Sequence, residues 1–141
     1  MIFYFAYGSN LHHQQMKKRC PNCEFIKKII LHNYFLTFRS KYGVADIQRK
    51  KGKKVFGGLY IISKAAEKRL DAYEEYPTLY KKMYFKYQGK KVMTYIMPKK
   101  NKLVSPTKRY LNIIKQGYKD CDINQKSLRD SLELLKNQIR R

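Results

Sequence analysis

The stretch IFYFAYGSNL, residues 2–11, decides how the chain begins to fold and raises the question of what its turn holds. Its first half is a short apolar run, rich in aromatic residues, which predicts a buried strand over residues 2–6. The strand leads into Gly8, Ser9 and Asn10. Because glycine permits backbone conformations that other residues avoid, successive N–H groups here can point the same way and form a concavity for an anion. An ordinary tight turn is the other interpretation of this segment.

Beyond this turn, the hydrophobic pattern predicts mostly strands. A short helix is expected over residues 11–19. The paired glycines Gly57 and Gly58 indicate a bulge or the close approach of another backbone. The basic segment RKKGKK, residues 49–54, is expected to be a glycine-centred turn. The strands predicted in this part of the chain are 24–31 and 34–39, broken by His32 and Asn33, followed by 43–47 and 55–63.

The second half of the chain adds helices and one hairpin. Ser63 is the expected N-cap of a helix that stops before Pro77, because proline disfavours helix at the preceding residue. The segments MYFKY (83–87) and KVMTYIM (91–97) flank QGK and predict a β-hairpin. Two helices are expected at the end: one capped by Ser105, with Pro106 in its first turn and Gly117 as its stop, and one over residues 124–141.

This order of elements predicts an α+β fold. Strands and helices do not alternate regularly, which argues against a doubly wound parallel sheet. A length of 141 residues is enough to bury one core, so we expect a single domain over residues 1–141.

The net charge of +22 is the most unusual property of the composition, with 32 Lys and Arg against 10 Asp and Glu. The lysines are scattered through every segment, as is typical of a coated surface, so we expect nonspecific adhesion to polyanions and no specific nucleic-acid partner. No run approaches the roughly 18 apolar residues of a membrane span, and no basic stretch precedes the first apolar run. We therefore expect a cytoplasmic protein without a membrane partner; the pattern specifies no oligomeric state.

The cysteines are an odd set of three, Cys20, Cys23 and Cys121. The C-x-x-C spacing of CPNC, with His12 and His13 nearby, has to be weighed as part of a zinc site. A structural zinc ion usually takes four ligands from two such pairs, and no second C-x-x-C occurs in the chain. We therefore expect thiols in a reducing compartment, and neither a metal nor a cofactor.

A second candidate for chemistry is DAYEEYPTLY, residues 71–80, which holds three of the chain's 10 acidic residues. Carboxyl groups packed against tyrosines are candidates for a raised pKa, which suits proton transfer near neutral pH. The alternative explanation is that Asp71 and one of the glutamates lie on the solvent-exposed face of a helix. The dinucleotide and P-loop signatures are absent, and Ser9 does not lie in a G-x-S-x-G elbow.

Together, these stretches resemble the gamma-glutamylcyclotransferase-like family over nearly the whole chain. The turn Tyr-Gly-Ser-Asn-Leu after a first strand, followed about sixty residues later by L-D-x-x-E, is a specific combination. The segments that carry the resemblance, in the family's order, are YFAYGSNL (4–11), RCP (19–21), VFGGLYIIS (55–63), LDAYEEYPTLY (70–80), VMTYIM (92–97) and SPTKRYLNIIKQG (105–117).

The resemblance implies a small mixed β-barrel with flanking helices and assigns roles to individual residues. Glu74 matches the family's catalytic acid, and the chain has Glu75 where the family commonly has glycine. Neighbouring side chains near a helix end point about 100° apart, so Glu74 facing the pocket would turn Glu75 away. The residues that match the family's substrate-binding positions are Tyr7, Gly8, Ser9, Asn10 and Leu11 in the turn, together with Tyr80 and Tyr95.

The activity implied by the resemblance is the conversion of a gamma-glutamyl amino acid, or a related amide, to 5-oxoproline with release of the amine. A cyclotransferase acting on gamma-glutamyl amines, or on a biosynthetic intermediate carrying a gamma-glutamyl group, is an alternative within the same fold. An alternative of another class is a protein without catalytic activity that binds a small acidic ligand or a polyanion through its lysines.

Overall fold

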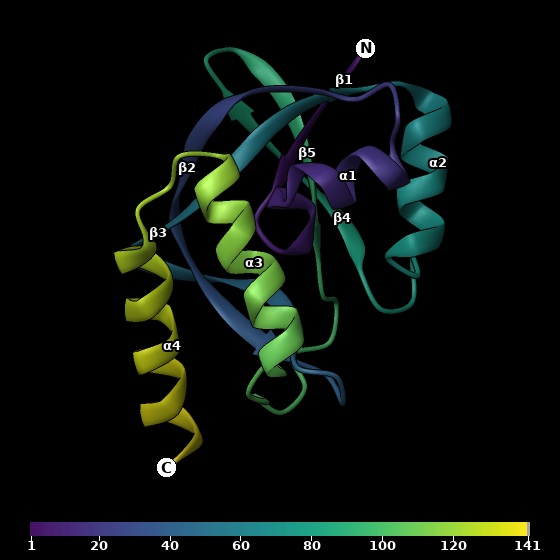
Figure 1. Ribbon diagram of the computed structural model, residues 1–141. Helices are drawn as coiled ribbons and strands as arrows, with labels where there is room; N and C mark the ends of the chain where they lie inside the picture. Colours follow the sequence, from purple (N-terminus) through teal and green to yellow (C-terminus); the bar gives the residue numbers. More distant parts are fainter. Residues whose placement is uncertain (141) are drawn as a thin grey trace.

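An open five-stranded mixed sheet forms the centre of the structure, a computed structural model that describes residues 1–140 (Figure 1). The strands follow one another across the sheet in the order β2-β3-β1-β5-β4, with β1 in the middle. Their bounds are Ile2–Ala6 for β1, Glu24–Arg39 for β2, Val44–Ile62 for β3, Lys81–Tyr87 for β4 and Lys90–Ile96 for β5.

The first strand is as predicted. It pairs antiparallel with β3, where Tyr4 lies opposite Tyr60, and parallel with β5, where Tyr4 lies opposite Met93. A Cβ atom on Gly57 of β3 would lie 2.4 Å from the carbonyl oxygen of Ala6. The close backbone approach expected at the paired glycines is therefore confirmed, and it lets β1 sit deep in the sheet.

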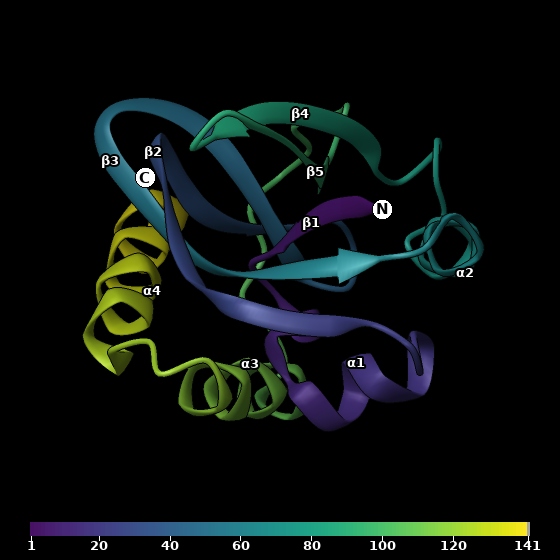
Figure 2. The same ribbon diagram turned by 90° about the horizontal axis from the view of Figure 1, so that it is seen from above.

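Within residues 1–140, four α-helices and one 3₁₀ turn surround the sheet. Figure 2 shows α1, α3 and α4 on one side of the curved strands, with α2 beside the end of the sheet. The predicted α+β fold with flanking helices is confirmed. The bounds are Ser9–Leu11 for the 3₁₀ turn η1, His13–Arg19 for α1, Lys64–Tyr73 for α2, Lys108–Asp120 for α3 and Gln125–Ile139 for α4.

The long hairpin of β2 and β3 replaces the four separate strands expected there. The register passes from His32 opposite Lys54 to Tyr34 opposite Arg49, so residues 50–53 face the unpaired Asn33. Asn33 has a positive φ of 67°, and its Oδ1 accepts a hydrogen bond from the N–H of Gly52 at 3.1 Å. The prediction that strands end at residues 32–33 and at the turn of residues 49–54 was wrong. Both segments are irregularities within the continuous strands β2 and β3.

Helix α3 begins and ends later than expected. Thr107 is its N-cap, and the Thr107 side chain accepts a hydrogen bond from the N–H of Tyr110. Gly117 does not stop the helix, which continues to Asp120. A Cβ atom on Gly117 would lie 2.5 Å from Cβ of Leu11 and 2.7 Å from the backbone nitrogen of His12. The glycine therefore allows α3 to pack directly on the turn after β1.

The sheet does not close into the expected barrel. Its edge strands, β2 and β4, are separated by a groove of about 610 Å³, lined by residues 28–32 and 85–88 together with Phe56. Closure would require the two edges to approach to about 4.8 Å and to pair, whereas β2 and β4 remain unpaired with each other.

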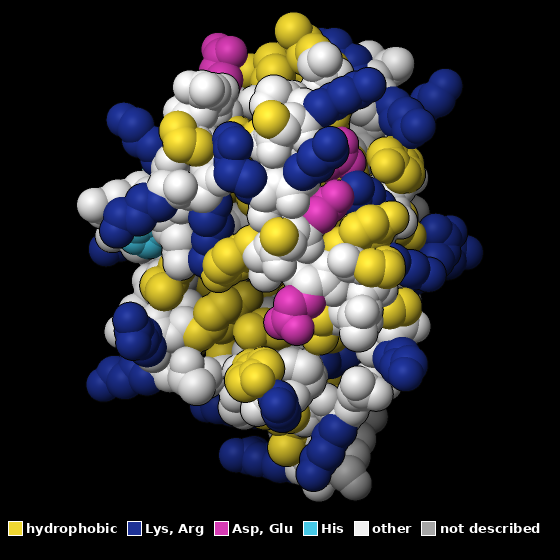
Figure 3. Space-filling view, turned by 90° about the vertical axis from the view of Figure 1, so that its right-hand side faces the viewer, with side chains coloured by type: hydrophobic (Ala, Val, Ile, Leu, Met, Phe, Trp, Pro, Cys, Tyr) yellow, Lys and Arg dark blue, Asp and Glu magenta, His cyan; other side chains and the backbone are white. Residues whose placement is uncertain are grey.

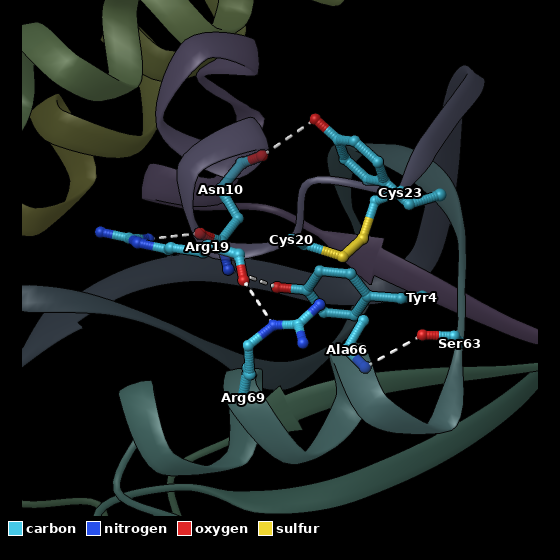
Figure 4. Close-up of a disulfide and its surroundings, with 9 residues drawn as sticks. Tyr4, Asn10, Arg19, Cys20, Cys23, Ser63, Ala66 and Arg69 are labelled. Atoms are coloured by element: carbon cyan, nitrogen blue, oxygen red, sulfur yellow. Dashed lines mark hydrogen bonds between the residues drawn. A yellow bond between two sulfur atoms is a disulfide. The ribbon is translucent and has the colours of Figure 1, made fainter.

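Cys20 and Cys23 are joined by a disulfide, so the expectation of two thiols was wrong (Figure 4). Cys20 is the residue after α1, and its carbonyl accepts a hydrogen bond from the N–H of Cys23 at 3.1 Å. This tight turn brings the two Cα atoms to 5.4 Å. Among residues 1–140 there is no cluster of three or more His, Cys, Asp or Glu side chains that could hold a metal ion.

Within the same residues, every helix is too short or too polar to cross a membrane.

Candidate functional site

A narrow pocket of about 30 Å³ lies where the turn after β1 meets the end of α2. It brings together residues from segments far apart in the sequence, between Tyr4 and Tyr110. Of the residues expected at the site, Glu74, Tyr7, Gly8, Ser9, Asn10, Tyr80 and Tyr95 line it. The other lining residues are Tyr4, Ala45, Thr94 and Tyr110.

The turn that forms one wall is a single 3₁₀ turn. The N–H of Leu11 donates to the carbonyl of Gly8 at 3.1 Å, and the N–H of His12 donates to the carbonyl of Ser9 at 3.1 Å. The N–H groups of Ser9 and Asn10 precede these bonds and so have no acceptor within the turn. A Cβ atom on Gly8 would lie 3.1 Å from Cβ of Ala45, so the absence of a side chain at Gly8 lets the turn pack closely against Ala45.

Leu11 does not line the pocket. Its side chain is fully buried in the core, and its N–H closes the turn. The sequence resemblance placed Leu11 with the substrate-binding residues, whereas the structure places it as an anchor behind the turn.

Asn10 is the link between the turn and Glu74. Its side chain is 3% exposed, and Nδ2 donates to the hydroxyl of Tyr4 at 2.9 Å and to Oε1 of Glu74 at 3.4 Å. Its backbone carbonyl accepts a hydrogen bond from the hydroxyl of Tyr60 at 3.0 Å. Both ends of Asn10 are therefore fixed, and its amide donates toward the carboxyl group of Glu74.

Glu74 is placed by the geometry of α2. Ser63 caps the start of this helix, accepting a hydrogen bond from the N–H of Ala66 at 3.0 Å, as predicted. Glu74 follows the last residue of the helix, and its N–H donates to the carbonyl of Leu70 at 2.8 Å. Desolvation by burial raises the pKa of Glu74 to about 7, although the charge of Arg19 and the bond from Asn10 oppose the rise. The carboxyl group can therefore exchange a proton near neutral pH.

The neighbouring Glu75 is exposed and does not line the pocket. Its backbone has a positive φ of 54°, in the left-handed region that favours glycine. Glu75 therefore lies outside the pocket that Glu74 lines, as expected. The conformation also gives a physical reason for the glycine that the family commonly has at this position.

Tyrosine side chains form the remaining walls and are anchored to the backbone. The hydroxyl of Tyr7 donates to the carbonyl of Tyr95 at 2.6 Å, and the hydroxyl of Tyr80 donates to the carbonyl of Ala45. The hydroxyl of Tyr95 donates to Oδ1 of Asp71 at 2.6 Å. Burial raises the pKa of each tyrosine that lines the pocket, so their hydroxyl groups stay protonated; these are Tyr4, Tyr7, Tyr80, Tyr95 and Tyr110.

Tyr110 and Arg19 are among the residues at the site that were not expected from the sequence as functional. Tyr110 of α3 lines the pocket, and its hydroxyl accepts a hydrogen bond from the N–H of Ala45 at 3.0 Å. Arg19 at the end of α1 donates to Oγ of Ser9 at 3.2 Å. It also donates to Oδ1 of Asn10, as Figure 4 shows. The only signal in the sequence was that both residues fall in segments that carry the family resemblance.

The surrounding surface is mostly basic, with an acidic exception near α2. Figure 3 shows a few acidic side chains beside a hollow lined by side chains of the hydrophobic class, which includes tyrosine, with Lys and Arg around them. Helix α2 and the residues after it contribute Glu67, Asp71, Glu74 and Glu75. Lys82 forms ion pairs with Glu67 at 2.8 Å and with Asp71 at 2.9 Å. The pair with Lys82 helps to fix Asp71, whose carboxylate accepts the hydrogen bond from the Tyr95 hydroxyl.

Chemically, the site combines a carboxyl group that can exchange a proton with backbone N–H groups and neutral hydroxyls in a confined space. Such a site can bind a small polar molecule and move a proton on it.

The sequence profile of the family described as gamma-glutamyl cyclotransferase, AIG2-like, matches residues 4–117. The chain therefore belongs to this family. No curated protein sequence gives a significant match.

Solved structures share the fold over almost the whole chain. An uncharacterised Homo sapiens protein, loc79017, has a TM-score of 0.80 at 23% identity, covering 99% of this chain and 98% of that one. A structure titled gamma-glutamyl cyclotransferase has a TM-score of 0.78 at 25% identity, covering 96% of this chain and 86% of that one. YkqA from Bacillus subtilis has a TM-score of 0.75 at 22% identity, covering 99% of this chain and 54% of that one.

Proposed function

We propose that this protein is a gamma-glutamylcyclotransferase that converts a gamma-glutamyl amino acid, or a related amide, to 5-oxoproline and a free amine. The observation that carries the proposal is the position of Glu74, whose carboxyl group has a pKa of about 7 and faces the turn of residues 8–10 across a narrow pocket. Membership of the family and the likeness to a structure titled gamma-glutamyl cyclotransferase support it.

The reaction forms one C–N bond and breaks another. The α-amine of the glutamyl group attacks its own γ-carbonyl carbon, closing a five-membered lactam, and the original amide bond breaks. Because both reacting groups belong to one molecule, holding the glutamyl part folded supplies much of the rate enhancement. The turn of Gly8, Ser9 and Asn10 is suited to this task through its backbone N–H groups.

Glu74 serves as the proton carrier in this proposal. As a carboxylate it accepts the proton that the attacking amine loses, and as a carboxylic acid it then gives that proton to the leaving nitrogen. A pKa of about 7 places the group between the two states at neutral pH. The N–H groups of Ser9 and Asn10 are the proposed donors to the carbonyl oxygen as it gains negative charge; losing one such donor typically costs about 3 to 4 kcal/mol.

The test is incubation of the purified protein with gamma-glutamyl dipeptides, with 5-oxoproline and the free amino acid measured by mass spectrometry. Formation of both products in equal amounts supports the proposal. A parallel incubation with gamma-glutamyl alkylamines separates the amine-directed alternative, because the two substrate sets differ only in the leaving group. Binding of either set without product formation would favour a protein that only binds its ligand.

A further inference from the structure

Arg19, the last residue of α1, is attached to both halves of the pocket. On the side of the turn, it donates to Oγ of Ser9 at 3.2 Å and to Oδ1 of Asn10. On the side of α2, its guanidinium carbon lies 3.4 Å from the centre of the Tyr73 ring, and it also donates to the Tyr73 hydroxyl. Its carbonyl accepts a hydrogen bond from Nε of Arg69 at 3.3 Å. Arg19 thus holds the last turn of α2 next to the turn after β1.

These contacts reach Glu74 through Asn10. A side-chain amide has one accepting and one donating end, so a guanidinium at Oδ1 fixes which end faces the carboxyl group. With Oδ1 held by Arg19, Nδ2 is directed to Tyr4 and to Oε1 of Glu74, and Figure 4 shows Arg19 and Tyr4 directed at the side chain of Asn10. Tyr73, which the guanidinium covers, directly precedes Glu74 in the chain.

Arg19 is also the positive charge that acts on this carboxyl group. Its charge lowers the pKa of Glu74, whereas burial, the larger effect, raises it. The other groups facing Glu74 are either neutral or negative, and none of them stabilises the carboxylate by charge. They are Tyr4 from β1, Tyr95 from β5, Tyr110 from α3, Tyr7 and Tyr80 from the connections, and the adjacent Glu75.

We infer that Arg19 is the positioning residue of this site: it orients Asn10 toward Glu74 and, through Asn10, places a positive charge on the carboxyl group's side of the pocket. The catalytic half of this inference rests on the proposed function. The effect of the Arg19 charge on the titration of Glu74 concerns the protein without substrate and can be measured directly.

The experiment compares Arg19→Met, Arg19→Lys and the control Lys18→Met. Lys18 is exposed on the same helix, so its replacement removes one positive charge from α1 without touching the pocket. The titration of Glu74 is followed by NMR of protein labelled at the glutamate side-chain carboxyl carbon, and the signal is assigned with Glu74→Gln. The rate of 5-oxoproline formation is measured over the same pH range.

For Arg19→Met, the titration midpoint of Glu74 is expected to rise by about 1 unit, the lower end of the effect of an adjacent opposite charge. The pH at which the rate reaches half its maximum should rise by the same amount, because Glu74 accepts a proton only as a carboxylate. For Arg19→Lys, the midpoint should stay near that of the wild type, while kcat falls about tenfold, since an ammonium lacks the planar fork that holds Asn10 and stacks on Tyr73. Lys18→Met should match the wild type in both measurements.

An unchanged Glu74 midpoint in a folded Arg19→Met protein would overturn the inference. If that variant does not fold, Tyr73→Leu replaces it: Tyr73 is 50% exposed, and its loss removes the ring that orients Arg19. The Glu74 midpoint should then rise less than in Arg19→Met but measurably, and no rise would count against the inference. If the wild type forms no 5-oxoproline, the proposed function fails, while the NMR titration still decides whether Arg19 controls Glu74.

Discussion

Asn10 and Glu74 meet across the pocket, with Nδ2 of Asn10 3.4 Å from Oε1 of Glu74, although 64 positions separate them in the chain. The contact joins the turn after β1 to the residue that ends α2. It joins the turn proposed to bind the substrate and the proposed proton carrier, Glu74, in one hydrogen-bonded unit. A substitution at either residue should therefore alter the position of the other.

Replacing Glu74 and Glu75 separately tests the assignment of the proton carrier. Glu74→Gln keeps the size of the side chain but cannot accept a proton, so turnover should fall by about two to four orders of magnitude. Glu75→Gln should change turnover less than about tenfold, because Glu75 is exposed outside the pocket. The measurement is the rate of 5-oxoproline formation with the best gamma-glutamyl substrate. Activity in both variants would contradict the mechanism.

The stability of the protein should depend on the charge of Glu74. Its pKa is raised from 4.5 to about 7 in the folded state, so the folded state binds this proton more tightly than the unfolded chain. The carboxyl group therefore reduces stability progressively as the pH rises from about 4.5 through 7, by at most about 3.4 kcal/mol. Glu74→Gln, which resembles the protonated form, should melt higher than the wild type at pH 8 and at the same temperature near pH 4. Glu75→Gln serves as the control, and equal melting curves for Glu74→Gln and wild type at pH 8 would refute the expectation.

Glu75→Gly should stabilise the fold. A residue other than glycine in the left-handed conformation costs roughly 1 to 2 kcal/mol, whereas the extra flexibility of glycine costs roughly 0.5 to 1 kcal/mol. The first effect is larger, so we expect a net gain of about 0.5 to 1 kcal/mol in urea unfolding. Ala72→Gly, at an exposed position within α2, is the matched control and should destabilise by about 1 kcal/mol. Equal losses for both variants would mean that the conformation of Glu75 is not strained.

Gly117→Ala should destabilise the protein even though alanine favours helices. The helical preference of alanine is worth about 1 kcal/mol, but its methyl group would lie 2.7 Å from the backbone nitrogen of His12. Overpacking against a fixed backbone typically costs about 1 to 3 kcal/mol. We therefore expect a net loss of up to about 2 kcal/mol in unfolding and a lower kcat, since the displaced segment adjoins the turn of the pocket. Asn112→Ala, exposed on the same helix, should cause neither effect, and a stabilised Gly117→Ala protein would disprove the tight contact.

The basic surface should give only weak binding to nucleic acid. With a net charge of +22 and lysines spread over all segments, association should be indifferent to sequence and fall steeply as salt rises through the physiological range. The measurement is fluorescence anisotropy with labelled duplexes of unrelated sequence between 50 and 200 mM salt. A preference of about a hundredfold for one sequence at physiological salt would point to a specific nucleic-acid function.

Local signals in the sequence were sufficient for much of the fold. The apolar run of β1, the cap at Ser63 and the hairpin of β4 and β5 are each encoded within a few residues, and the structure has all three. The long hairpin of β2 and β3 was predicted as four separate strands, because a bulge at Asn33 has the same residue composition as a turn. The prediction that Gly117 ends its helix was wrong, because the sequence does not distinguish a glycine that ends a helix from one that allows a tight packing contact.

The site was predictable in part for the same reason. Glu74 and the turn of residues 7–10 were predicted from the family resemblance that two short motifs carry, and the structure brings them together. Arg19 was not found, because its role depends on contacts with Ser9, Asn10 and Tyr73 that only the folded chain creates. The disulfide between Cys20 and Cys23 was missed because the same spacing also fits two thiols.

The pocket has walls from β1, the turn after it, β3, the end of α2, β5 and α3, so none of these segments forms it alone. A ligand that touches several walls therefore recognises the folded chain and not the unfolded one, and its binding energy adds to the free energy of unfolding. At a ligand concentration one hundred times its Kd, that addition is about 2.7 kcal/mol. A cell rich in the ligand would thus hold less of the protein in the open, protease-sensitive form, and the lifetime of the protein would follow the supply of the molecule that it binds.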